Sequence, residues 1–442
     1  MEAEFFNATV LHTAKTVKGS DIVDIIQYGT SEELNDDRSG YPILRLNEFD
    51  NTFIKEPARY CDKITEQEYR ELQLKQDDVL ICRTNGNPDL VGRSAIVMED
   101  ALYAFASYLF RVRTNALILP HVLVAYLRGK YGRAEIDKYS MKGNQTNFSP
   151  AKFREIDVPI FEQSFQDKIK GAFINAYSLH ISAKEIYAQA EAILNTYLNI
   201  RDYDNSGYSV KTLFNSFIQS GRLDAEYYQP KYDTLFETLS HFAIANLSGE
   251  NGLVSIKKSI EPGSEAYQDE GIPFVRVSDV NKYGIVEPTI KLASTIVPDI
   301  ESLFPCKDTI LLSKDGSVGI AYKVEENMQV ITSGALLHLT VKDTNQILPD
   351  YLTLVLNSQV VQLQAERDCN GAIIQHWKPS DIEKVLIPIL DMDKQKEISD
   401  KVQESFRLRK EAKQLLDNAI RAVEMAIETD EETALIWLDS QL

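Results

Sequence analysis

Two segments in each half of the chain combine arginine, lysine, asparagine, glutamine or histidine with small turn-forming residues. Arginine donates hydrogen bonds in a fixed geometry that matches guanine, and asparagine or glutamine does the same for adenine. Such side chains recognise a polar edge and do not by themselves break a bond. The residues with this chemistry are Arg83, Thr84, Asn85, Arg93, Lys142, Asn144, Gln145 and Asn147 in the first half, and Ser313, Lys314, Gln375, His376 and Lys378 in the second. We take them as candidate contacts to base edges.

No pattern of a catalytic or metal site accompanies these donors. The sequence has no GxGxxG or phosphate-binding loop, and Asn87-Pro88-Asp89 lacks the second proline and the aromatic ring of an adenine methyltransferase tetrad. The six histidines and the four cysteines are not spaced as metal ligands. We therefore predict no catalytic residue, no metal and no cofactor. The scattered cysteines favour a reducing cytosol, and no apolar run reaches transmembrane length.

Several of these positions also have a purely structural interpretation. Asn85-Gly86 and Asp315-Gly316 are residue pairs typical of a two-residue type I′ hairpin, so we expect turns there, with DNA contact on the turns left open. For Arg45 and Arg276 a structural ion pair is preferred to a phosphate contact.

One aromatic side chain precedes a proline in each half, at Phe148 before Pro150 and at Trp377 before Pro379. An exposed ring at such a place stacks on a base or a sugar. A buried ring instead fills the core, and large aromatic side chains are mostly buried. We expect both rings to be core residues.

The sequence contains an internal repeat. The same phrases return about 230 residues further on, and a constant offset over half-chains indicates a duplicated domain. The repeated phrases are Gly40-x-Pro42-x-x-Arg45 with Gly271-x-Pro273-x-x-Arg276, Asp78-Val79-Leu80-Ile81 with Asp308-Thr309-Ile310-Leu311, Pro150 and Pro159 with Pro379 and Pro388, and residues 2–6 with residues 224–228. Two similar domains suit a long, nearly symmetric ligand that is read at two places, and duplex DNA is such a ligand.

The donor-rich segments follow short runs rich in β-branched and other apolar residues, which we expect to be strands. The expected strands are residues 43–46, 79–82 and 108–112 in the first half, and residues 274–277, 309–312 and 336–340 in the second. A short helix should begin at Pro120 and another at Pro349, because proline is favoured in the first helical turn.

Each half then ends in a long helix with a coiled-coil seam. Apolar residues recur at alternating spacings of three and four residues, and this pattern predicts two helices that pack on each other. The seam residues include Ile169, Phe173, His180, Tyr187 and Leu194 in the first helix, and Ile398, Val402, Arg409, Leu416 and Val423 in the second. If the helices are antiparallel, His180 and Arg409 both lie near the middle and would form a polar layer. We prefer a satisfied core histidine and an arginine that reaches water.

The predicted fold class is α+β, with two pseudo-symmetric mixed α/β domains and two long coiled-coil helices that pack on each other. The predicted boundaries are residues 1–160 for the first domain, 161–221 for the first long helix and linker, 222–390 for the second domain, and 391–442 for the second helix and an acidic tail. A helix of 35 residues is about 50 Å long, so the pair would act as a ruler longer than one duplex turn.

The charge opposes DNA binding by the chain alone. The chain has 47 Lys and Arg against 66 Asp and Glu, a net charge of -19. Nonspecific DNA affinity comes from cations that displace counterions, so we expect weak binding without partners.

The repeated phrases resemble the specificity subunit of type I restriction-modification systems, known as HsdS. The matching phrases in the second half are RLDAEYYQPKY (222–232), GIPFVRVSDV (271–280), LLSKDGSVG (311–319) and WKPSDIEKVLIPIL (377–390). The resemblance implies a non-enzymatic subunit with two target recognition domains separated by two long antiparallel helices. It implies that this subunit reads a split, asymmetric site in double-stranded DNA with one domain for each half. It also implies two methyltransferase subunits (HsdM-like) and nuclease or translocase subunits (HsdR-like) as partners, in the cytoplasm and without a membrane.

Two other functions were weighed against this one. An acidic protein that mimics DNA and inhibits a restriction or methylation enzyme would need a regular stripe of carboxylates, whereas the repeats preserve turns, prolines and an apolar seam. A fused methyltransferase would need a catalytic region that these residues lack.

Overall fold

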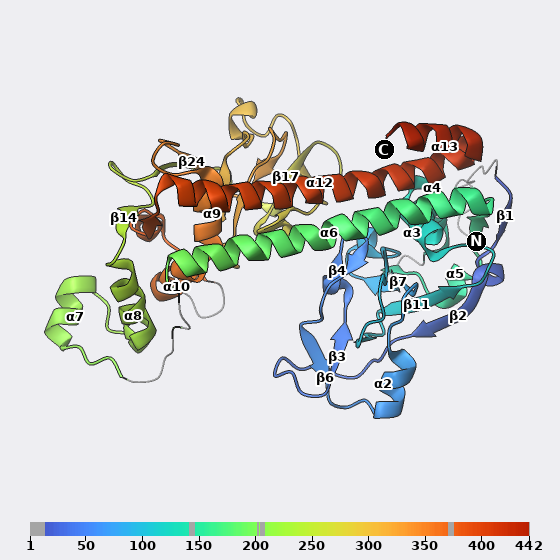
Figure 1. Ribbon diagram of the computed structural model, residues 1–442, viewed down its shortest axis with the longest axis horizontal. Coiled ribbons are helices and arrows are strands. Elements are labelled where there is room, and N and C mark those ends of the chain that lie inside the picture. The colour runs from blue at the N-terminus through green and yellow to red at the C-terminus, as the bar shows by residue number, and fades with distance from the viewer. Residues whose placement is uncertain (1–13, 141–145, 201–202, 204–207, 370–374, 442) are drawn as a thin grey trace. The chain divides into compact units, whose positions relative to one another are not determined.

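The computed structural model describes residues 14–140, 146–200, 203, 208–369 and 375–441 (Figure 1). The chain divides into two compact units, one made of Met1–Ile181 with Leu408–Leu442 and the other of Ser182–Arg407. Each unit holds one mixed α/β domain and a part of each of two long helices, α6 (Gln163–Tyr197) and α12 (Met392–Glu428). The α+β prediction is confirmed. The matching residues 2–6 and most of the linker at 201–207 lie outside the described residues.

Domain 1, in the first unit, is built on two small sheets. The four-stranded sheet is antiparallel and has the order β2 (Val23–Tyr28), β11 (Leu109–Thr114), β7 (Val79–Cys82) and β9 (Ser94–Ile96). In the second sheet β3 (Tyr41–Leu44) lies between β10 (Ala104–Phe105), which is parallel to it, and the antiparallel β6 (Arg59–Cys61). All four residues of β7 are buried, as expected for a continuous apolar run at the centre of a sheet.

Domain 2, in the second unit, repeats this plan. Its antiparallel sheet has the order β15 (Val254–Lys258), β24 (Leu336–Val341), β21 (Ile310–Ser313) and β22 (Ala321–Lys323). Its second sheet has the order β16 (Tyr267–Gln268), β20 (Lys291–Leu292), β17 (Ile272–Val275) and β23 (Ile331–Thr332), with β23 parallel to β17. The antiparallel sheet has the same order and directions in both domains, and the second sheet of domain 2 repeats that of domain 1 with one additional strand, β16, so the sequence repeat is also a structural repeat.

Short ribbons and helices complete both domains. The two-stranded pairs are β1 (Thr16–Lys18) with β13 (Asp157–Pro159), β4 (Phe49–Asp50) with β5 (Phe53–Ile54), β8 (Thr84–Asn85) with β12 (Thr146–Asn147), β14 (Ala243–Asn246) with β25 (Leu386–Ile389), and β18 (Val280–Asn281) with β19 (Gly284–Ile285). The 3₁₀ turns are Gly19–Ile22, Leu46–Glu48, Pro88–Leu90, Ala225–Tyr228, Ser264–Ala266, Val277–Asp279 and Glu301–Leu303.

The remaining helices also repeat in part. The predicted short helices are α3 (Pro120–Arg128) and α9 (Pro349–Asn357), and both begin at proline. The other helices are α2 (Glu66–Leu72), α4 (Lys130–Tyr139), α5 (Pro150–Phe153), α7 (Leu213–Ser220), α8 (Pro230–Leu239), α10 (Gln359–Asp368), α11 (Pro379–Ile382) and α13 (Glu431–Ser440).

A buried glutamine near the start of each long helix ties that helix to its own domain. Gln166 accepts a hydrogen bond at Oε1 from the backbone N–H of Leu119 (2.7 Å), just before α3. Gln395 accepts the equivalent bond from Leu348 (3.0 Å), just before α9. Both glutamines are at most 3% exposed. Because buried hydrogen-bonding groups are costly to leave unpaired, these contacts fix how each domain is mounted on its helix.

The long helices pack against each other within each unit. Ile169, Phe173, Leu416 and Val423 share the core of the first unit, and Tyr187, Leu194, Ile398 and Val402 share that of the second. In the second unit the helices are antiparallel, since Ser405 donates to the Ala183 carbonyl (2.7 Å), Lys401 to Gln189 (2.9 Å) and Tyr197 to Glu397 (2.5 Å).

Near the middle of the seam, His180 is paired with domain 1. His180 Nε2 lies 3.1 Å from a carboxylate oxygen of Asp50 in β4, and its ring packs on Phe53. The histidine is therefore satisfied by domain 1, as we preferred. Arg409 is half-buried, and Phe406 and Leu408 are buried beside it, so the seam shifts its phase there.

The acidic tail at the end of the chain contains a folded helix, α13. Asp430 caps α13 by accepting a hydrogen bond from the backbone N–H of Thr433 (2.8 Å). Ala434 and Leu438 are buried in the core of the first unit. Asp430, Glu431 and Glu432 lie at the start of this helix, where negative charge is favourable.

Candidate nucleic-acid interface

The loop after the central strand of domain 1 is joined to a distant segment. The chain leaves β7 at Cys82 and continues into β8, which pairs antiparallel with β12. Thr84 Oγ1 also donates to the carbonyl of Thr146 (3.1 Å). Two of the donor-rich segments, which are about 60 residues apart in sequence, therefore form one surface feature.

Domain 2 has the same arrangement in the same place. Asp315 and His376 form an isolated antiparallel bridge. The Gly316 N–H donates to the Gln375 carbonyl (3.0 Å), and the Trp377 N–H donates to the Lys314 carbonyl (2.8 Å). The Asp315–His376 bridge corresponds to the pairing of Thr84 with Asn147 in domain 1, because the Phe148 N–H donates to the Arg83 carbonyl as the Trp377 N–H donates to the Lys314 carbonyl. We use the name paired loop for the loop after the central strand together with the segment that pairs with it. These are residues 83–93 with 146–147 in domain 1, and residues 314–320 with 375–377 in domain 2.

Arg83 is the cation at the base of the paired loop in domain 1. Its guanidinium lies over the ring of Tyr28, 5.3 Å from the ring centroid, and Tyr28 is 44% exposed. Its backbone is fixed by main-chain hydrogen bonds with Tyr108 and Phe148. Its Nε is buried and has no hydrogen-bond partner in the described part of the chain. A cation held on a ring keeps its donors available for a ligand.

Arg93 lies at the other end of the same loop, immediately before β9. Burial lowers the pKa of Arg93, although a guanidinium stays charged at any physiological pH. Among the residues that the structure describes, no ion pair or side-chain hydrogen bond is found for it. The paired loop of domain 1 thus has two arginines that are not neutralised by a described carboxylate.

Domain 2 presents a different set of charges. Lys314 and His376 both bind the carboxylate of Asp315, with His376 Nδ1 2.8 Å from Oδ1 and Lys314 at Oδ2. Burial would raise the pKa of Asp315, but the hydrogen bonds from Lys314 and His376 outweigh it and hold that pKa below its ordinary value. The side chain of His376 is 60% exposed. Gln375 and Lys378 are exposed beside it.

Three of the other candidates serve the loops themselves. Ser313 is fully buried, and its hydroxyl donates to the Ser317 carbonyl (2.6 Å) and accepts from the Ile320 N–H (2.9 Å). It shapes the loop and does not face a ligand. Thr84 is bound to Thr146, and Asn85 accepts from the Asn87 N–H (2.8 Å).

The last candidates lie around β12. Asn147 is half-buried in β12. Lys142, Asn144 and Gln145 lie outside the described residues.

The expectation of two-residue hairpins is wrong. A type I′ turn needs a positive φ at both central residues, yet neither Asn85 nor Gly86 has one, and in the second pair only Gly316 does (74°). Strands β7 and β9 do pair antiparallel, but residues 83–93 connect them. The side chains and the pairing with β12 shape this longer loop.

The structural interpretations of the remaining residues are confirmed. Arg45 binds Glu48 through two hydrogen bonds (3.2 and 2.8 Å), and Arg276 lies 3.4 Å from Asp279. Both arginines come directly after a strand and precede a 3₁₀ turn. Phe148 and Trp377 are at most 1% exposed, so both are core residues.

Two residues of the paired loops were not among the sequence candidates. Tyr28 was missed because nothing in the sequence places β2 beside residue 83. Asp315 occupies the position of the candidate Thr84 in the structural repeat, so transferring that candidate between the two halves would have identified it.

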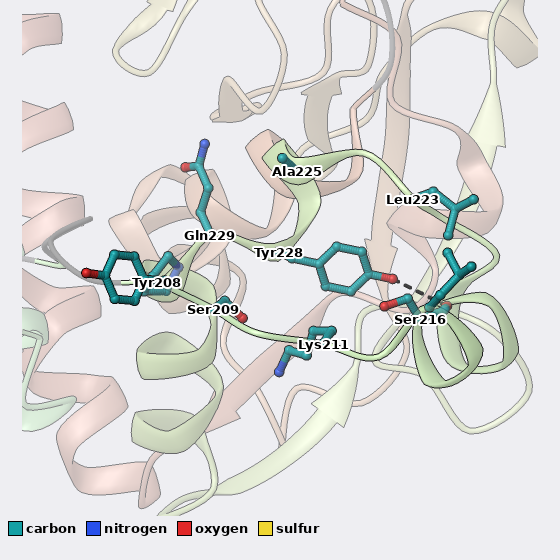
Figure 2. Close-up of a pocket in the computed structure, with 10 residues that line it drawn as sticks. Tyr208, Ser209, Lys211, Ser216, Leu223, Ala225, Tyr228 and Gln229 are labelled. Carbon is teal, nitrogen blue, oxygen red and sulfur yellow. Dashed lines mark hydrogen bonds between the residues drawn. The ribbon is translucent and has the colours of Figure 1, made fainter.

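A second surface feature lies around α7. Its large apolar side chains Leu213, Phe214, Phe217 and Ile218 are between 64% and 72% exposed. A pocket of about 480 Å³ adjoins this helix, and Tyr228, whose hydroxyl donates to the Ser216 carbonyl (3.3 Å), forms one wall (Figure 2). Exposed apolar patches of this kind mark contacts with other proteins.

Within the described residues, no group of His, Cys, Asp and Glu side chains is arranged to hold a metal ion. The helices of the described part also include none with the length and apolarity needed to span a bilayer.

One family model matches a segment of the second half of the chain. Residues 248–418 match the family model of the type I restriction modification DNA specificity domain. The matched range contains β21, the paired loop of domain 2 and more than half of α12. No curated protein sequence matches the chain significantly.

Solved structures of low identity are also similar. The S subunit of a type I restriction-modification system from M. genitalium is 12% identical, with a TM-score of 0.34 and coverage of 98% of this chain and 96% of that one. The HsdS subunit from Thermoanaerobacter tengcongensis is 14% identical, with a TM-score of 0.29 and coverage of 92% and 96%. At residues 248–418, which are less than half of the chain, the sequence is similar to the type I restriction modification DNA specificity domain.

Proposed function

We propose that this chain is the DNA sequence-recognition subunit of a type I restriction-modification complex and that it reads a bipartite, asymmetric site. The observation that supports this most directly is that both domains build the same paired loop on the same central strand. The family match covers only domain 2 and part of α12. The structural repeat extends the proposal to domain 1.

The difference between the two paired loops supports an asymmetric site. Domain 1 offers Arg83 on Tyr28 and Arg93, whereas domain 2 offers Lys314, Asp315 and His376. Side chains with different donors and acceptors select different bases. Two domains with the same scaffold and different contacts would therefore read two different half-sites.

We propose further that the chain is not itself an enzyme and acts with two methyltransferase subunits and with nuclease or translocase subunits. The exposed apolar face of α7 supports a protein partner, since water is a poor solvent for four large apolar side chains. The net charge of -19 also favours a complex in which the partner subunits make many of the contacts to DNA phosphates.

The test is to co-express the chain with a type I (HsdM-like) methyltransferase subunit and to sequence the methylated bases in the host genome. We expect one bipartite motif with two unlike halves. The chain alone should show weak duplex binding and no transfer of methyl groups from labelled S-adenosylmethionine. A single continuous motif, or methylation by the isolated chain, would refute the proposal.

A further inference from the structure

The exposed histidine of the domain 2 paired loop is held at two points. Its backbone forms the bridge with Asp315, and its Nδ1 lies 2.8 Å from the Asp315 carboxylate. The next residue, Trp377, is 1% exposed and anchors the segment in the core. An exposed side chain that binds no ligand usually samples several rotamers. Here the ring is fixed before any ligand arrives, which lowers the entropic cost of binding.

The contact with Asp315 determines which ring nitrogen carries the proton. An ionised carboxylate has only acceptors, so Nδ1 must be the donor of this hydrogen bond. Lys314 binds the other oxygen of the same carboxylate and holds it ionised. In the neutral ring, Nε2 is then an acceptor. Because 60% of the His376 side chain is exposed, this acceptor is available to a ligand.

The equivalent position in domain 1 carries a different group. Asn147 pairs with Thr84 as His376 pairs with Asp315, and Asn147 is half-buried. The same position of the two scaffolds therefore carries an amide in one domain and an oriented imidazole in the other. A scaffold position that varies in this way is suited to setting what each domain selects.

We propose that His376 is a specificity-determining residue of domain 2 and that Asp315 is its positioning residue. Neutral His376 accepts a hydrogen bond at Nε2 from an exocyclic amino group in the major groove, the N6 amine of adenine or the N4 amine of cytosine. This proposal rests on the proposed function, because it names the chemical group that the second domain reads.

The first experiment does not depend on DNA. Histidine labelled with ¹⁵N is introduced into the full chain, and the His376 signals are assigned by their loss in His376→Gln. We expect the neutral wild-type ring to carry its proton on Nδ1, and Asp315→Ala to yield a mixture of tautomers. A neutral wild-type ring with its proton on Nε2 would overturn the proposal.

The second experiment uses the complex with the methyltransferase subunit and a library of random DNA duplexes. His376→Ala should lose selectivity at one base pair of one half-site, by roughly 5- to 150-fold, while the other half-site is unchanged. His376→Gln keeps an acceptor and should retain part of the selectivity, and Asp315→Asn should weaken it at the same base pair. His241→Ala, which changes an exposed histidine of domain 2 outside the loop, is the matched control.

The outcomes separate this proposal from the proposed function. If the wild-type complex selects a bipartite motif and His376→Ala selects the same motif with equal strength, His376 does not determine specificity and the subunit assignment stands. Uniform weakening at every position would make His376 a phosphate contact and would also refute the proposal. If the wild-type complex selects no bipartite motif, the proposed function fails, whatever the tautomer of His376.

Discussion

Replacing Arg83 by methionine should change what domain 1 reads without unfolding the domain. The side chain contacts the ring of Tyr28 at 5.3 Å and makes no described salt bridge. The backbone of residue 83 is fixed by main-chain hydrogen bonds with Tyr108 and Phe148, which methionine keeps. Methionine also preserves most of the apolar stem that covers the ring. The loop should therefore keep its conformation.

The two expected effects differ in size. Loss of a partly exposed cation–π contact costs about 0.5 to 1 kcal/mol of stability. Loss of a bidentate arginine contact to a guanine costs about 1 to 3 kcal/mol of discrimination at one base pair, which is roughly a 5- to 160-fold change. The loss of selectivity should therefore exceed the loss of stability, and it should be confined to one half-site.

The assay is selection from a random duplex library by the complex with its methyltransferase subunit, with urea denaturation of each variant in parallel. Arg70→Met is the matched control in the same domain, because Arg70 pairs with Glu66 on an exposed helix face. Arg83→Lys keeps the charge but lacks the planar fork, so it should relax selectivity while it retains affinity better than methionine does.

Two results would refute this reasoning. If Arg83→Met weakens every duplex equally, Arg83 contacts a phosphate and reads no base. If it leaves selection unchanged but destabilises domain 1 by more than about 1 kcal/mol, the arginine is a structural residue that packs on Tyr28.

Three further predictions concern the core, the helices and pH. Phe148→Ala and Trp377→Ala should each cost about 3 to 5 kcal/mol of unfolding free energy in urea denaturation, because both rings are buried; a loss of DNA affinity without a loss of stability would contradict this. Matched four-residue insertions between residues 181 and 182 and between residues 407 and 408 add about 6 Å to each long helix and nearly restore its face, so the motif spacer in methylome sequencing should grow by about two base pairs. Burial lowers the pKa of His338 from 6.5 to about 4. Between pH 4 and pH 6.5 this histidine is therefore protonated in the unfolded chain and neutral in the folded chain. Stability should therefore fall as the pH drops from about 6.5 to 4, and His338→Gln should reduce this slope in urea denaturation.

The repeat, the central strands and the long helices could be predicted from the sequence because each leaves a local pattern. Residues 79–82 were predicted as a strand and form β7, since a short apolar run with turn residues around it has few other stable conformations. The long helices begin at residues 163 and 392, within three residues of the predicted starts, because the three-and-four spacing of apolar residues is a local property. The burial of Phe148 and Trp377 followed from side-chain chemistry alone.

The geometry of the candidate interface was decided only by the tertiary structure. Asn85-Gly86 has the composition of a tight hairpin, but pairing with β12 about 60 residues away outweighs the local turn preference. Ser313 has a polar side chain of the kind that faces solvent, yet it is buried because two backbone groups of its own loop satisfy its hydroxyl. His376 and Asp315 are about 60 residues apart in sequence. Contacts between segments that are distant in the chain depend on how the strands of the whole domain assemble, and no local sequence pattern encodes them.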